Sequence, residues 1–124
     1  MKNNIDVIIV GAGIAGITTA YYLQKNFPGI NYMILDSRNS VGGTWDQMKF
    51  PGVRADNDMY TYGFSFNPWV GSIIGNGADI RGYINETANK FKIKKNIVFN
   101  TQVSALSWKD NLWTTKTDKK NYTS

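Results

Sequence analysis

The stretch from residue 5 to residue 16, IDVIIVGAGIAG, decides the fold. Its first half, Ile5–Val10, is a short run rich in β-branched residues, which is typical of a strand buried on both faces of a parallel sheet. Its second half is a glycine turn with the spacing G-x-G-x-x-G, made by Gly11, Gly13 and Gly16. The stretch therefore predicts a strand that turns sharply into the start of a helix.

The residues that follow predict the rest of a β-α-β unit. Apolar positions from Ile14 onward recur at spacings of three and four, and Pro28-Gly29 ends them, which predicts a helix from about Gly13 to Asn26. A second apolar run, Tyr32–Leu35, predicts the next strand. Because such crossovers are nearly always right-handed, we expect the two strands to lie parallel in one sheet.

An acidic residue stands where a dinucleotide-binding turn needs one. Asp36 ends the second strand, about 20 residues after Gly16. In such a turn the glycines allow a tight bend and the close approach of a pyrophosphate, and the amides at the helix start face the phosphate oxygens. Asp36 would accept hydrogen bonds from the ribose hydroxyls and repel a 2'-phosphate. The pattern predicts bound FAD or NAD, and not NADP.

The middle of the chain carries weaker signals. Residues 37–51 are expected to be mostly loop, and the alternation of aromatic with small residues from Tyr60 to Phe66 predicts an extended segment with one aromatic face. Apolar residues at helical spacing predict an amphipathic helix from Asp79 to Phe91, with Asp79 as its N-cap.

The last third predicts β structure. Ile97–Phe99 is expected to be a brief third strand, and Val103–Trp108 and Leu112–Thr117 flank a turn and predict a hairpin. No strand is expected in the final residues, Asn121–Ser124.

Composition excludes several classes of chemistry. The 124 residues suit one domain, and they contain no Cys and no His. Disulfides, iron-sulfur clusters, Cys-His nucleophiles, covalently attached flavin and the Cys pair of flavin disulfide reductases are thereby excluded, and we expect no metal site. The lack of Cys favours a reducing, cytoplasmic location.

The uncharged stretch from Val7 to Gln24 is broken by glycines and polar residues, so we expect it to be buried rather than inserted in a membrane.

A longer set of motifs resembles one family. These motifs are Arg38, Gly42-Gly43-Thr44-Trp45, Phe50-Pro51-Gly52-Val53-Arg54-Ala55-Asp56 and Asp58-Met59-Tyr60-Thr61-Tyr62. In this order and spacing they resemble the FAD domain of class B flavoprotein monooxygenases, which comprise the flavin-containing and the Baeyer-Villiger monooxygenases. The resemblance implies an α/β, Rossmann-like FAD-binding domain with a parallel sheet and a β-hairpin or meander.

The resemblance also implies roles for single residues. The residues expected to bind FAD are Gly11, Gly13, Ala15 and Gly16 at the pyrophosphate, Asp36 at the ribose, Arg38 and the backbone of Val103 near the adenine, and Gly43, Thr44, Trp45 and Tyr62 beside the flavin half. Asp56 matches an acidic residue that lies by the flavin and supports its oxygen chemistry, and Arg54 stands two residues before it. We therefore expect Asp56 and Arg54 to be catalytic, with Asp56 also contacting the cofactor. A carboxylate so close to an arginine in an apolar loop is also a candidate for a buried ion pair.

The same family has a second dinucleotide domain for NADPH, and we expect residues 1–124 to lack it. Residues 1–124 hold one glycine fingerprint, so they are expected to be the truncated N-terminal FAD-binding part of an NADPH-dependent enzyme that oxygenates a small organic substrate. NADPH would act as reductant only in a complete enzyme. Sheet edges left unpaired would then need a complementing chain or a homo-oligomer to cover them.

Two alternatives stay open. The chain would serve as a non-catalytic module or remnant that holds FAD or NAD without turnover. The lysines of the last third and the formal net charge of +5 raise nucleic-acid binding as a further hypothesis, but no RNA-binding motif accompanies them, and we expect no nucleic-acid partner.

Overall fold

A three-stranded parallel sheet organises the computed structural model, which describes residues 5–124. Its strands are β1 (Val7–Val10), β2 (Tyr32–Leu35) and β3 (Ile97–Val98), in the order β1-β2-β3. Val7 pairs with Tyr32 and Ile34 pairs with Ile97, so β2 lies in the centre. The predicted parallel sheet is confirmed, although β1 begins at Val7 rather than Ile5 and β3 ends at Val98 rather than Phe99.

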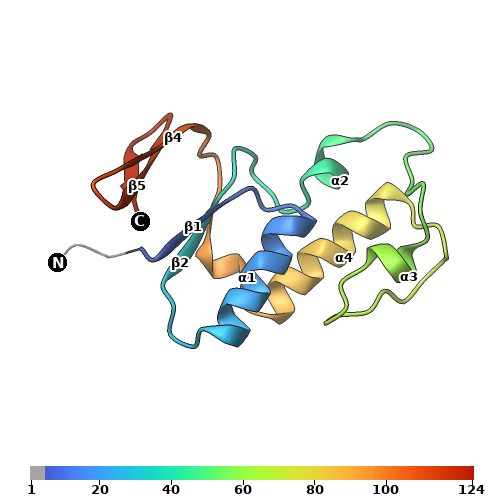
Figure 1. Ribbon diagram of the computed structural model, residues 1–124. Helices are drawn as coiled ribbons and strands as arrows, with labels where there is room; N and C mark the ends of the chain where they lie inside the picture. The colour runs from blue at the N-terminus through green and yellow to red at the C-terminus, as the bar shows by residue number, and fades with distance from the viewer. Residues whose placement is uncertain (1–4) are drawn as a thin grey trace.

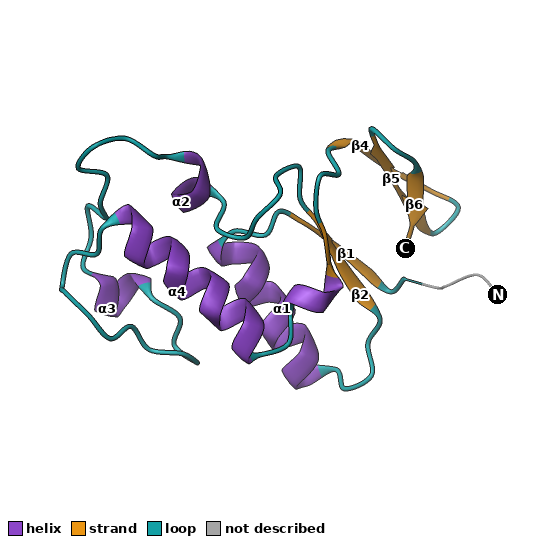
Figure 2. Cartoon of the chain, turned by 180° about the vertical axis from the view of Figure 1, so that it is seen from behind, coloured by secondary structure: helices purple, strands orange, loops and turns teal. Residues whose placement is uncertain are grey.

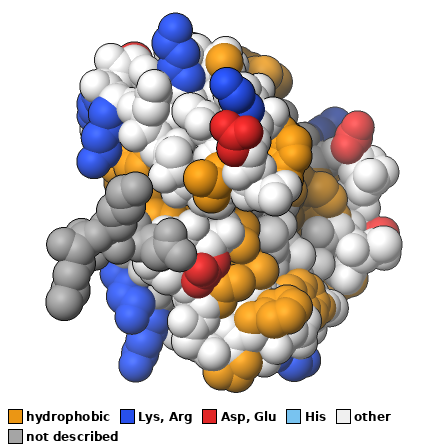
Figure 3. Space-filling view, turned by 60° about the vertical axis from the view of Figure 1, so that its left-hand side comes forward, with side chains coloured by type: hydrophobic (Ala, Val, Ile, Leu, Met, Phe, Trp, Pro, Cys, Tyr) orange, Lys and Arg blue, Asp and Glu red, His pale blue; other side chains and the backbone are white. Residues whose placement is uncertain are grey.

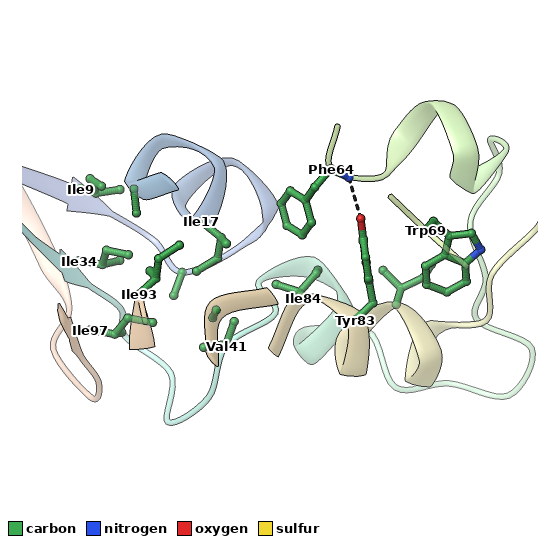
Figure 4. Close-up of a cluster of buried hydrophobic side chains, with 14 of the residues drawn as sticks. Ile9, Ile17, Ile34, Val41, Phe64, Trp69, Tyr83, Ile84, Ile93 and Ile97 are labelled. Carbon is green, nitrogen blue, oxygen red and sulfur yellow. Dashed lines mark hydrogen bonds between the residues drawn. The ribbon is translucent and has the colours of Figure 1, made fainter. Parts of the chain in front are cut away.

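Two long helices cover one face of this sheet. Helix α1 (Ile14–Asn26) connects β1 to β2, as predicted, and α4 (Gly77–Lys90) lies beside α1 (Figure 1). The core between them and the sheet is built from fully buried side chains, among them Ile17, Ile34 and Ile84 (Figure 4). The core therefore fixes the direction in which the N-terminus of α1 points.

An antiparallel meander lies on the other side of the sheet (Figure 2). Strands β4 (Val103–Lys109) and β5 (Leu112–Thr117) form the predicted hairpin. The expectation of no strand at the chain end is wrong, because β6 (Asn121–Thr123) pairs with β5. The hydroxyl of Thr117 accepts hydrogen bonds from the amides of residues 119 and 120, and this turn returns the chain for pairing.

The aromatic segment at Tyr60–Phe66 is not extended, contrary to prediction. Met59–Tyr62 form the short helix α3, and the Asp58 carboxylate caps it by accepting a hydrogen bond from Thr61 N at 2.8 Å. The helix separates the aromatics: Tyr60 is exposed, whereas Phe64 is buried. A local cap therefore prevails over the period-two pattern.

Three further boundaries differ from the prediction. Helix α4 is capped by Asn76, whose side chain accepts from Asp79 N at 2.8 Å, so Asp79 lies in the first turn and is not the N-cap. A short helix, α2 (Thr44–Gln47), interrupts the expected loop, and a 3-10 turn, η1 (Lys94–Asn96), precedes β3. None of the helices within residues 5–124 is long and apolar enough to cross a membrane.

Hydrophobic side chains remain exposed on the side where the parallel sheet meets the meander. Val10 on β1 and Leu106 and Trp113 on the meander are each about half exposed and line a cavity of about 350 Å³ between the two sheets. Figure 3 shows hydrophobic side chains reaching the surface on this side of the molecule. Strand β1 pairs only with β2 among the described strands, so its other edge is unpaired.

A buried hydroxyl ties α4 to the loop after α3. Tyr83 Oη accepts a hydrogen bond from Phe64 N at 2.8 Å (Figure 4), and it donates to the Asn67 carbonyl oxygen at 2.5 Å. We predict that Tyr83→Phe lowers the free energy of unfolding by about 1–3 kcal/mol, because it leaves the buried Phe64 amide without a partner. Urea denaturation measures this loss.

The matched control is Tyr60→Phe. The Tyr60 hydroxyl donates to the Gly71 carbonyl oxygen at 2.7 Å, but its side chain is exposed, so water replaces the lost bond. Equal losses in the two variants would contradict the role given to Tyr83.

Candidate functional site

The turn between β1 and α1 has the geometry that its glycines predict. Gly11 has φ +100°, and its amide donates to the Leu35 carbonyl oxygen at 2.8 Å, which places the turn beside the end of β2. A Cβ on Gly16 would lie 1.9 Å from the Gly11 carbonyl oxygen, so only glycine lets α1 approach the turn this closely.

The N-terminus of α1 is open. Gly13 is its N-cap, no side chain caps it, and no acidic residue lies in its first turn. The first amides of a helix have no intrahelical partner and carry the positive end of the helix dipole. This end of α1 can therefore bind an anion.

A second glycine pair packs against the first turn. Gly42 N donates to the Ala12 carbonyl oxygen at 3.1 Å, and a Cβ on Gly43 would lie 2.9 Å from Gly13 Cα. The two glycine loops thus form one continuous backbone surface. This contact between motifs 30 positions apart was not predicted, although both motifs were identified.

A cavity of about 300 Å³ opens over this surface. It brings together eight of the residues predicted to bind the cofactor: Gly11, Gly13, Ala15, Gly16, Gly43, Thr44, Trp45 and Tyr62. Trp45 Nε1 donates to Tyr62 Oη at 3.2 Å, and the two rings meet edge to face, so these side chains form one aromatic wall. The cavity therefore has an amide floor suited to phosphate and an aromatic wall suited to a planar ring.

Asp36 lies at the end of β2 and is almost fully buried, with 6% of its surface exposed. Its Oδ2 accepts a hydrogen bond from Ala12 N at 2.6 Å, and its Oδ1 accepts from Arg38 N at 2.7 Å. The carboxylate thus holds the glycine turn in place, a role that the sequence analysis missed. Each carboxylate oxygen can accept more than one hydrogen bond, so both keep capacity for ribose hydroxyls.

Arg38 points its side chain toward Asp46, a residue that the sequence analysis did not single out. Arg38 Nε lies 2.8 Å from Asp46 Oδ2, and Lys49 and Arg81 approach Oδ1 at 3.5 and 3.9 Å. Asp46 is 3% exposed. Burial by itself would raise the pKa of Asp46, but hydrogen bonds from Arg38 and Ser40 and the charges of Lys49 and Arg38 hold this pKa below its ordinary value.

Val103 begins β4 close to the end of β2. The segment before Val103 is hydrogen-bonded to the residues that follow β2. Asn100 N donates to the Arg38 carbonyl oxygen at 2.9 Å, and Thr101 N donates to the Asp36 carbonyl oxygen at 2.8 Å. Val103 is half-buried and lies outside the lining of the glycine cavity.

Arg54 and Asp56 lie apart from the glycine loops. Both are exposed, neither lines the cavity, and no ion pair joins them within the described part of the chain. The expected buried pair is therefore not formed. The intervening Ala55 is buried, and its amide donates to the Gly75 carbonyl oxygen at 2.9 Å, which turns the two charged side chains of this segment toward solvent.

Comparison with known proteins decides the family. The family described as NAD(P)-binding Rossmann-like domain matches residues 9–75, which include both glycine loops and Asp36. The chain belongs to this NAD(P)-binding Rossmann-like domain family. The residues that define the cavity floor are therefore those of a dinucleotide-binding family.

Within this Rossmann-like family, the relatives confirm the resemblance to flavoprotein monooxygenases. The chain is 48% identical to the FAD-containing monooxygenase EthA of Mycolicibacterium smegmatis over 92% of its own length, and 44% identical to EthA of Mycobacterium tuberculosis over the same share. A structure of OTEMO in complex with FAD and NADP superposes over 99% of the chain with a TM-score of 0.87 and 28% identity. The chain spans about a quarter of the length of these relatives, 24% of each EthA and 25% of the OTEMO chain.

The close approach of α1 to the turn gives a first test of the site. We predict that Gly16→Ala lowers the free energy of unfolding by about 1–3 kcal/mol or more, because its methyl group would overlap the Gly11 carbonyl oxygen. The matched control is Gly82→Ala in α4, where no atom lies within 4 Å of an added Cβ and the helix gains from alanine. Thermal denaturation of both variants measures the difference, and equal stability would contradict the packing described.

The buried carboxylate of Asp46 gives a second test, in pH. Because its folded-state pKa is lowered, its contribution to stability is present above the unfolded-state pKa of about 4 and is lost as the pH falls through the folded-state value. We predict that Asp46→Asn has a lower free energy of unfolding than wild type at pH 7. The difference in free energy of unfolding between the two proteins is expected to narrow below about pH 4. Asp110→Asn, at an exposed hairpin position, is the control. If the difference in free energy of unfolding between wild type and Asp46→Asn stays constant with pH, the lowered pKa assigned to Asp46 is wrong.

Proposed function

We propose that the chain binds FAD, with the diphosphate of the cofactor on the amides at the N-terminus of α1. The observation that carries this proposal is the cavity over two glycine loops whose backbones are in contact. Its floor offers unpaired amides and the positive end of a 13-residue helix, both of which favour phosphate. The relatives that share this stretch are named as FAD-containing monooxygenases, which supports FAD over NAD.

The adenosine half of FAD would lie toward the end of β2. Asp36 stands there with both oxygens able to accept further hydrogen bonds, so we assign it to the ribose hydroxyls. We assign the backbone of Val103 and the Arg38 segment to the adenine, because residues 100–101 are bonded to residues 36–38 at this end of the sheet.

The flavin half would lie toward Gly43, Thr44, Trp45 and Tyr62. The Trp45 and Tyr62 rings form a wall at that end of the cavity. Bound flavin would supply the redox chemistry, and these residues would orient its ring and exclude water. We keep Asp56 and Arg54 as proposed catalytic residues on the strength of the family motif, with exposed side chains free to face additional parts of the protein.

We further propose that residues 1–124 are the FAD-binding part of a longer NADPH-dependent monooxygenase that acts on a small organic substrate. The chain spans about a quarter of the length of its relatives and has one glycine fingerprint, so a second nucleotide site for NADPH would lie elsewhere in such a protein. The unpaired edge of β1 and the exposed Val10, Leu106 and Trp113 support a complementing chain or a homo-oligomer on that side.

One observation favours a second candidate, a binding module without turnover. Arg54 and Asp56 do not line the cavity, so the described residues provide binding groups but no charged group at its wall. NADPH oxidation by FAD-loaded protein separates the two candidates. Because the NADPH site is proposed to lie outside residues 1–124, turnover by a longer protein that includes it would favour the enzyme, and retention of FAD there without turnover would favour the binding module.

The fit of FAD can be tested at a residue whose replacement the fold tolerates. Gly13 has φ −84°, and an added Cβ would lie 3.5 Å from Gly43 Cα, an ordinary contact distance. We predict that Gly13→Ala folds like wild type but binds FAD roughly tenfold more weakly or worse, because its methyl group would occupy the space into which the pyrophosphate approaches the backbone. Flavin absorbance after desalting, followed by equilibrium titration, measures the loss.

Gly82→Ala again serves as the control, since it lies on α4 and does not line the glycine cavity. Unchanged FAD affinity in a folded Gly13→Ala protein would count against the proposed site. If wild type itself fails to retain FAD and instead takes up NAD, the cofactor assignment is wrong while the dinucleotide site stands.

A further inference from the structure

The backbone and the side chain of Arg38 serve two different sites. Its amide donates to Asp36 Oδ1 at 2.7 Å, which fixes the residue beside the carboxylate assigned to the ribose. Its guanidinium, however, is turned to Asp46, where Nε donates to Oδ2 at 2.8 Å and Nη2 donates to the backbone carbonyl oxygen at 3.3 Å. The cation nearest in sequence to the predicted ribose site is therefore already engaged.

An arginine at this position has a specific chemical consequence. In dinucleotide-binding folds, an acidic residue at the end of the second strand accepts the ribose hydroxyls, and a nearby arginine accommodates a 2'-phosphate. This chain has both residues, Asp36 and Arg38, within two positions. The residue types alone would therefore allow either an unsubstituted or a phosphorylated ribose, and the orientation of the Arg38 side chain decides between them.

Asp46 is well placed to determine that orientation. Its side chain is 5% exposed, so its charge is poorly screened, and Arg38 makes the shortest of its three cationic contacts. Two hydrogen bonds to one residue also fix the direction of the guanidinium. Lys49 is the more exposed partner and lies three residues from Asp46 on the same segment, so it can be removed without touching Arg38.

We propose that Asp46 is a specificity-determining residue: it holds the Arg38 guanidinium away from the ribose, so that the site takes dinucleotides with a free 2'-hydroxyl and rejects those with a 2'-phosphate. The inference rests on the proposed function, because it places the adenosine of the ligand at Asp36. In this proposal two carboxylates act against a ligand with a 2'-phosphate. Asp36 repels the phosphate directly, and Asp46 keeps the Arg38 guanidinium from binding the phosphate.

The test compares NAD⁺ with NADP⁺, which differ only in the 2'-phosphate. Amide NMR titrations of the 124-residue chain measure both dissociation constants, even when they are millimolar. Wild type is expected to bind NAD⁺ more tightly. In Asp46→Ala the preference is expected to shift toward NADP⁺ by about tenfold, because a freed arginine gains a charge-assisted contact to phosphate. Asp46→Asn, which keeps an acceptor for Arg38, is expected to shift it less.

A second substitution distinguishes a selective role from a merely structural one. Adding Arg38→Gln to Asp46→Ala is expected to abolish the shift, whereas Lys49→Ala alone is expected to leave the ratio of the two constants as in wild type. A folded Asp46→Ala protein with an unchanged ratio would overturn the proposal, and so would a shift that persists without Arg38.

Arg38→Gln alone tests the proposal even if the Asp46 variants do not fold. Because the wild-type guanidinium is held by Asp46, its loss is expected to leave the NAD⁺-to-NADP⁺ ratio unchanged, and weaker binding of NADP⁺ alone would contradict the proposal. If wild type binds neither FAD nor NAD⁺, the proposed function fails and the inference fails with it. Binding of FAD or NAD⁺ without the expected shift refutes the inference alone.

Discussion

The structure depends on the contact of main chain with main chain at the two glycine loops. Gly16 lets α1 lie against the Gly11 carbonyl, and Gly13 and Gly43 meet with no side chain between them. A side chain at Gly16 would push α1 away from the turn, and one at Gly43 would push the second loop away from the first. Close packing here leaves the amides at the start of α1 as the exposed chemical feature of the cavity, and this feature suits the site to phosphate.

Two buried carboxylates connect these loops to the rest of the fold. Asp36 joins the glycine turn to the end of β2 through Ala12 N and Arg38 N, and Asp46 joins the Arg38 side chain to α2. Arg38 thus contacts both carboxylates, Asp36 through its amide and Asp46 through its guanidinium. Buried charges of this kind are stable only when paired, and each oxygen of both groups has a donor or cation.

The sequence predicted the β-α-β unit well because three independent signals agreed there: β-branched strands, helical spacing and glycine placement. It was wrong at α3, where the Asp58 cap and the distant Tyr83 hydroxyl outweigh the alternating aromatics. It also missed Asp46, whose cationic partners Arg38 and Arg81 come from separate segments that only the fold brings together. The eight residues that the sequence predicts to bind the cofactor at its pyrophosphate and flavin parts line one cavity, whereas Arg54 and Asp56 carry a motif but no contact that reveals their role.

The most direct test of the central claim is a crystal structure of the 124-residue chain with FAD. We predict the diphosphate within hydrogen-bond distance of the amides at the N-terminus of α1, the ribose on Asp36 and the flavin ring toward Trp45. FAD bound between the sheet and the meander, or a diphosphate that touches neither glycine loop, would contradict the account.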